Sequence, residues 1–166
     1  MRRLVSAIYL CLVVPVIAQE PLLNFEKNDF EEDIIYEQIE GVLIDADGFN
    51  WIGTTTGLYK YDGYSITPHY HNSQLETTIS EDFVTSLFED SHGYIWVGTY
   101  NNGLNIYDKR YQSFYKFRHD STDDTSISTN RIPRSNRIIV EDNEGFIWLN
   151  TQNGLNKIDP DTKKVE

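Results

Sequence analysis

One ten-residue stretch occurs three times in this chain. The copies read DADGFNWIGT at Asp45–Thr54, DSHGYIWVGT at Asp90–Thr99 and DNEGFIWLNT at Asp142–Thr151. Each is followed by Gly-Leu, at 57–58, 103–104 and 154–155, and the 3 tryptophans all lie in these copies, 45 and 52 positions apart. A period of roughly 40–50 residues is typical of propeller blades and related repeat arrays.

The chemistry of each copy predicts a hairpin. An aspartate stands three positions before a glycine, which is the pattern of a type I turn whose last residue takes a positive φ. In the middle copy we expect strands near Phe83–Glu89, Tyr94–Thr99, Gly103–Asp108 and Ser113–Phe117. Side chains alternate along a strand, and both faces of Tyr94–Thr99 carry apolar residues. The sheet is therefore expected to lie between two neighbouring sheets.

The sequence predicts an all-β fold of propeller blades, each with four antiparallel strands. About three blades are expected, at 38–70, 83–117 and 136–166, in an incomplete ring, since propellers typically have four to eight. Polar connectors at His71–Asp82 and Arg118–Arg134 separate them, and the tryptophan spacing suggests that the second is seven residues longer. Ile132–Ser135 occupies the position where the first strand of blade three would begin, so we expect that strand to start late.

The N-terminus has the pattern of an export signal. Arg2 and Arg3 precede an apolar run, Leu4–Val14, and small residues end at Ala18, so residues 1–18 are predicted to be a cleaved signal peptide. An uncleaved anchor helix is the alternative, which Pro15 and the short run disfavour. Residues 19–37 are predicted to be an acidic extension. The single cysteine, Cys11, falls inside the signal, so disulfides are not expected to stabilise the mature chain.

Charge argues against two classes of partner. The 14 basic and 26 acidic residues give a formal net charge of −12, which nucleic-acid phosphates and anionic lipid surfaces repel. No second long apolar run follows the signal. We therefore expect no nucleic-acid partner for this segment and no membrane contact once the signal is removed.

Two patterns resemble metal sites. Asp45, Asp47 and Asn50 alternate like part of a calcium loop, but the Asp47 position is His92 and Glu144 in the other copies, and no distal bidentate glutamate follows. His69 and His71 could form a two-histidine arm, but no third ligand accompanies them. Turn capping and an exposed edge pair are the favoured interpretations, so no metal site and no cofactor are predicted.

No pattern indicates catalysis either. Neither a nucleophile elbow nor a singled-out carboxylate pair is present, and the leading serine of the sialidase turn is missing. The tryptophans are expected to pack in the core. Loop-end aromatics such as Tyr70, Tyr100 and Tyr111 are better placed for a ligand, but the sequence identifies no specific ligand-binding residue.

Glu89–Thr99, continued by Gly103–Asp108, resembles the two-component regulator propeller repeat, and the resemblance covers about residues 38–166. Asn150 in place of glycine and Ile158-Asp159 in place of Tyr-Asp are departures in the third copy. The resemblance implies the N-terminal periplasmic sensor part of a hybrid two-component histidine kinase in the inner membrane. It also implies an oligosaccharide ligand, a homodimeric full receptor, and partners in the remaining blades and the kinase portion.

On this basis the segment is expected to be a non-catalytic part of a ligand sensor, the kinase activity belonging to the full-length family member. Two alternatives remain open. One is a stand-alone secreted propeller module that completes its ring by oligomerising, and the other is a propeller glycosidase.

Overall fold

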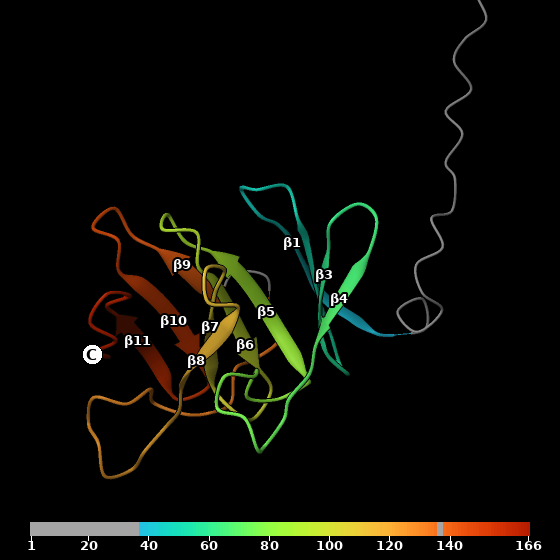
Figure 1. Ribbon diagram of the computed structural model, residues 1–166. Coiled ribbons are helices and arrows are strands. Elements are labelled where there is room, and N and C mark those ends of the chain that lie inside the picture. The colour runs from blue at the N-terminus through green and yellow to red at the C-terminus, as the bar shows by residue number, and fades with distance from the viewer. Residues whose placement is uncertain (1–36, 136–137) are drawn as a thin grey trace, which may run out of the picture.

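The computed structural model describes residues 37–135 and 138–166, and these form strands without a helix (Figure 1). The predicted signal peptide and nearly all of the predicted extension lie outside the described residues. The strands are β1 (Ile39–Ile44), β2 (Asn50–Thr54), β3 (Leu58–Tyr61), β4 (Ile66–His69), β5 (Val84–Glu89), β6 (Ile95–Thr99), β7 (Leu104–Asp108), β8 (Ser113–Phe117), β9 (Ile139–Glu141), β10 (Ile147–Thr151) and β11 (Gly154–Ile158).

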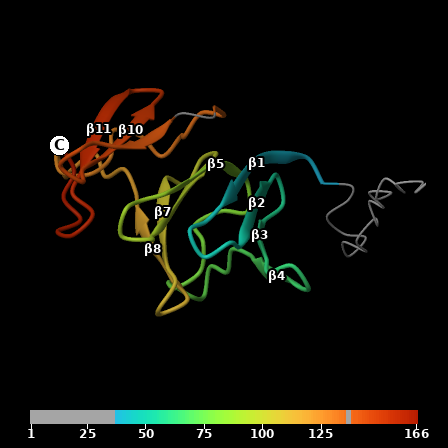
Figure 2. The same ribbon diagram turned by 90° about the horizontal axis from the view of Figure 1, so that it is seen from above.

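These strands form three antiparallel meanders in chain order: β1–β4, β5–β8 and β9–β11. Figure 2 shows the three sheets side by side, with β5–β8 between the other two and no closed ring over the described residues. The predicted fold class, blades in an incomplete ring, is therefore confirmed. In the middle blade the predicted strand limits agree with the observed ones to within one residue.

The third sheet is the least regular. It has three strands, and the fourth is represented by a single bridge between Ile158 and Val165. Its first strand has 3 residues, whereas β1 and β5 have 6 each, and it begins only at Ile139. The late start expected from Ile132–Ser135 is thus confirmed. Ile132 itself is fully buried in the core, so the segment is anchored although it is not a strand.

Two apolar cores lie between the blades. Trp51, Leu58 and Ile95 belong to a buried cluster shared by the first and second sheets. Trp96 belongs to a second cluster, shared by the second and third sheets, which includes Ile147. Trp51 and Trp96 therefore each face the blade that follows in the chain. All five residues of β6 are buried, which confirms that the middle sheet is covered on both faces.

A glycine two positions after the tryptophan lets the next blade approach. A Cβ atom on Gly98 would lie 2.3 Å from the Ser86 hydroxyl and 2.8 Å from a methyl carbon of Ile132. Asn150 replaces this glycine in the third blade and is exposed. On the same face Trp148 is half-buried, while Val140 and Leu155 are 45% and 61% exposed. Lys157 of the same blade lies over the Trp148 ring, but no neighbouring blade among the described residues covers this apolar face.

No helix that could span a membrane is present over residues 37–135 and 138–166.

Candidate functional site

The aspartate of each turn holds both the turn and the tryptophan. Asp45 Oδ1 accepts hydrogen bonds from the amides of Asp47 at 3.1 Å and Phe49 at 2.9 Å. Its Oδ2 accepts from the indole Nε1 of Trp51 at 2.9 Å. The glycine of the turn has φ of +87°, as predicted. The same three bonds recur at the equivalent positions of Asp90 and Asp142.

This geometry supports the interpretation of the motif as turn-capping. The bond from the indole to the aspartate six positions earlier was not predicted from the sequence. The equal Asp-to-Trp spacing in all three copies was the available signal.

His69 and His71 do not form a metal arm. The His69 ring stacks on Trp51 with ring centroids 5.6 Å apart, while Nδ1 of His71 lies 2.8 Å from the carbonyl oxygen of Ile79. Burial and the nearby charge of Lys60 lower the pKa of His69 to about 4. Within the part of the chain that the structure describes, no three His, Cys, Asp or Glu side chains are grouped as a metal site would require.

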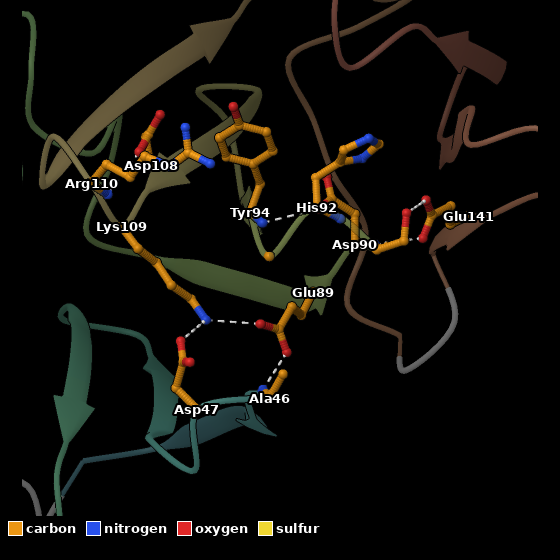
Figure 3. Close-up of a pocket in the computed structure, with 12 residues that line it drawn as sticks. Ala46, Asp47, Glu89, Asp90, His92, Tyr94, Asp108, Lys109, Arg110 and Glu141 are labelled. Carbon is orange, nitrogen blue, oxygen red and sulfur yellow. Dashed lines mark hydrogen bonds and ion pairs between the residues drawn. The ribbon is translucent and has the colours of Figure 1, made fainter.

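A cavity of about 650 Å³ lies at the ends of the sheets where the Asp turns meet (Figure 3). Its lining includes turn residues of the first two blades and Glu141 of the third. Lys109, which follows β7, crosses to the first blade. Its Nζ lies 2.9 Å from Asp45 Oδ2, 2.9 Å from Asp47 Oδ2 and 2.8 Å from Glu89 Oε1.

The electrostatics of this cluster are those of a tightly paired group. Burial alone would raise the pKa of Asp45, but hydrogen bonds from Trp51, Lys109 and Phe49 and the Lys109 charge hold it below its usual 3.8. Burial would lower the pKa of Lys109, yet its bonds to the three carboxylates raise it well above its usual value. Both groups are therefore held in their charged forms at neutral pH.

We call the first strand of each blade (β1, β5 and β9) its inner strand. A glutamate at the end of β5 and of β9 forms a second link between blades, whereas β1 ends in Ile44. Glu89 Oε2 accepts from the amide of Ala46 in the preceding blade at 2.7 Å. Glu141 accepts from both the amide of Ser91, at 2.8 Å, and its hydroxyl, at 2.5 Å. We call this hydrogen bond, donated by a turn amide to the glutamate of the following blade, the inter-blade clamp. The cavity in Figure 3 therefore lies beside the groups that join the blades.

The two connectors between the blades resemble each other more closely in length and hydrogen bonding than was expected from the sequence. His71–Asp82 and His119–Asn130 have equal length and the same bonds, for example from each histidine amide to the side chain of the last residue, at 2.6 and 2.7 Å. The expectation of a connector seven residues longer was wrong. Four extra residues lie between Ser128 and Glu141, and the other three lie within the second blade, before His119.

A buried asparagine attaches each connector to its blade, and the sequence analysis missed it. Asn105 accepts from the Ser80 amide at 2.9 Å and donates to the Ser80 hydroxyl at 2.9 Å and the Val97 carbonyl at 3.2 Å. Asn156 makes the equivalent bonds with Ser128 and Leu149. The Gly-Leu-Asn sequence at 103–105 and 154–156 was the signal that could have revealed it.

Comparison with known proteins gives one consistent result. The family model described as "Two component regulator propeller" matches residues 78–101. The chain is 40% identical over 143 residues to Histidine kinase P4 from Formosa agariphila, a match that covers 80% of this chain and 10% of that protein. The chain thus spans about a tenth of the length of this curated relative.

Solved structures agree with the match. The extracellular domain of BT3049 from B. thetaiotaomicron, whose name assigns it to a hybrid two component system, superimposes with a TM-score of 0.70 at 26% identity, covering 78% of this chain and 18% of that one. Virginiamycin B lyase from Staphylococcus aureus gives a TM-score of 0.55 at 19% identity, over 78% of this chain and 40% of that one, which is a likeness of fold alone. Repeat, fold and relatives thus agree: residues 78–101 match the two-component regulator propeller model, and the chain is similar to Histidine kinase P4 and to the extracellular domain of BT3049.

Proposed function

We propose that this chain supplies N-terminal blades to the periplasmic sensor of a hybrid two-component receptor, and that the sensor binds an oligosaccharide. The observation that carries the proposal is the superposition on the extracellular domain of BT3049, together with the sequence match to a histidine kinase. In such a receptor, ligand binding shifts the arrangement of the sensor and so changes the activity of the attached kinase. This coupling requires that the ligand bind the two arrangements with different affinities.

The uncovered face of the third blade supports a place within a larger ring. Trp148 and its neighbours occupy the positions at which Trp51 and Trp96 meet the following blade. The turn amides of Ala46 and Ser91 each donate a hydrogen bond to a glutamate of the following blade. Among the described residues, no carboxylate accepts a hydrogen bond from the equivalent amide of Asn143. The partner that fits is a further blade of the same repeat, with a glutamate at the end of its inner strand.

The kinase response tests the proposed function. The longer protein that contains this chain would be placed in lipid nanodiscs with ATP and pools of oligosaccharides from hydrolysed plant and algal polysaccharides. We expect at least one pool to change histidine autophosphorylation several-fold. A longer protein without a histidine kinase domain, or one whose autophosphorylation no pool alters, would contradict the proposal.

A further inference from the structure

The opposite ends of the sheets, away from the Asp turns, carry an irregularity that the repeat does not need. From Ser80 to Glu89 the chain takes nine positions, but from Ser128 to Glu141 it takes thirteen. The four extra residues fall in the segment before β9, which contains Arg131, Pro133 and Arg134. In repeat proteins, insertions within single repeats form loops on one face, and such loops often contribute to ligand binding.

The insertion presents two arginines that aromatic rings hold in place. The guanidinium of Arg131 lies 4.8 Å from the centroid of the Tyr100 ring, and that of Arg134 lies 4.6 Å from the Phe83 ring. Phe83 and Tyr100 are themselves stacked, with centroids 4.9 Å apart and planes inclined by 20°. Stacking of this kind fixes the plane of a guanidinium. Nη2 of Arg131 also donates a hydrogen bond to the Tyr100 hydroxyl at 2.5 Å, and the other N–H donors of the group remain for a ligand.

These arginines border a cavity of about 500 Å³, together with Pro133 and Gln152. Among the ion pairs of the described residues, none involves Arg131, and Arg134 has one contact of 3.5 Å with Glu40 Oε1. The chain has a formal net charge of −12, so acidic side chains were available. Two neighbouring guanidinium groups whose positive charges are paired with only one carboxylate favour the binding of an anionic ligand.

A second, more enclosed cavity of about 300 Å³ adjoins the insertion at Ser135. It lies among the inner strands β1, β5 and β9. Glu40 and Thr85 occupy equivalent β-bulges there, where the register of the inner strand shifts by one residue. Bulges redirect side chains and are frequent beside functional sites.

Two hydroxyl oxygens in this cavity, Thr85 Oγ1 and Ser86 Oγ, are buried without a hydrogen-bond partner in the described part of the chain. The buried Glu40 Oε1 makes no hydrogen bond there either and has only its 3.5 Å ion-pair contact with Arg134. Thr85 and Ser86 are only 2% and 7% exposed. Buried polar atoms are nearly always satisfied by protein, water or a ligand. Two hydroxyls, which can donate and accept, and a carboxylate, which accepts, are suited to the hydroxyl groups of a sugar ring.

We infer that this end of the sheets is a binding site for an acidic sugar residue. Arg131 and Arg134 take its carboxylate or sulfate group, and Glu40, Thr85 and Ser86 take its hydroxyls. The sugar part of the inference rests on the proposed function, whereas the preference for an anion rests on the two arginines alone.

Titration calorimetry on the full chain tests the inference with three probes: tetragalacturonate, a sulfated carrageenan tetrasaccharide and neutral maltotetraose. We expect at least one acidic probe to bind, and to bind more weakly at high salt. The double variant Arg131→Gln, Arg134→Gln should weaken that binding at least tenfold, and Thr85→Val should weaken it by a smaller factor. Which acidic probe binds distinguishes a carboxylate from a sulfate ligand.

Arg110→Gln is the control, because it removes one guanidinium charge at the other end of the sheets, beside the cavity of Figure 3. It should leave the affinity unchanged. Thermal unfolding of each variant separates loss of binding from loss of folding. Failure of both acidic probes to bind, or equal weakening by Arg110→Gln, would overturn the inference. Maltotetraose binding as tightly as the acidic probes would also overturn it, while leaving an oligosaccharide-sensing function intact.

Discussion

Trp96→Ala is expected to destabilise the chain by about 3–5 kcal/mol, the usual cost of removing a fully buried indole from a core. Trp96 has no exposed surface and stacks on Phe117 with centroids 5.8 Å apart, inside the core between the second and third blades. The loss is a large part of the 5–15 kcal/mol by which domains are typically stable. Urea unfolding of the chain, followed by far-ultraviolet circular dichroism, measures it.

Trp148→Ala is the matched control. It removes the same residue type and the same indole bond to aspartate, of 2.7 Å in both blades. Its side chain is only half-buried, so we expect a loss of about 1–2 kcal/mol, in proportion to the smaller apolar area covered. The difference between the two variants reports the packing between blades. Equal losses would show that Trp96 does not lie between two blades, and if Trp96→Ala does not fold, Trp96→Phe provides the same comparison at smaller amplitude.

Lys109→Met should cost about 2–4 kcal/mol at pH 7. The substitution keeps the apolar stem but leaves Asp45, whose side chain has no exposed surface, without its cation. Removing one partner of a buried ion pair typically costs about 3–5 kcal/mol, and the 20% exposure of Lys109 reduces this figure. Lys116→Met is the control, since its partner Glu76 is 90% exposed and the pair is 3.4 Å apart. There we expect less than about 1 kcal/mol.

The pH dependence gives this prediction a second readout. The folded pKa of Asp45 lies below its usual 3.8, so its contribution to stability is present above that value and is lost as the pH falls through the folded pKa. Without Lys109 the folded pKa of Asp45 rises toward its unfolded value, so the loss of stability on acidification should be smaller than in the parent chain. Parallel stability curves from pH 3 to pH 7 would contradict the assigned ion pair.

The sequence predicted what local chemistry determines. Asp-x-x-Gly turns form from their own side chains, and the two apolar faces of Tyr94–Thr99 require neighbours on both sides. Strand limits and the incomplete ring followed from these features. The role of the Asp motif as scaffold was also predictable, because three equal copies with variable middle residues do not suit a ligand site.

What could not be predicted depends on residues far apart in the chain. Lys109 meets Asp45 only because the second blade stacks on the first, and no spacing rule indicates a partner 64 positions away. The paired arginines likewise depend on the aromatic residues of the preceding blade, which the insertion reaches across the stack. The insertion was noted in the sequence as an irregular strand start, but its contacts were not foreseen.

Amide hydrogen exchange at Asn143 tests the central claim most directly, because a further blade must place its glutamate there. It would be measured in this chain and in the proposed longer receptor, with Ala46 and Ser91, whose amides the inter-blade clamp already holds, as internal references. We predict that Asn143 exchanges quickly in the chain and becomes as protected as Ser91 in the longer protein. Fast exchange of Asn143 in both, while Ser91 stays protected, would contradict a ring that continues past the third blade.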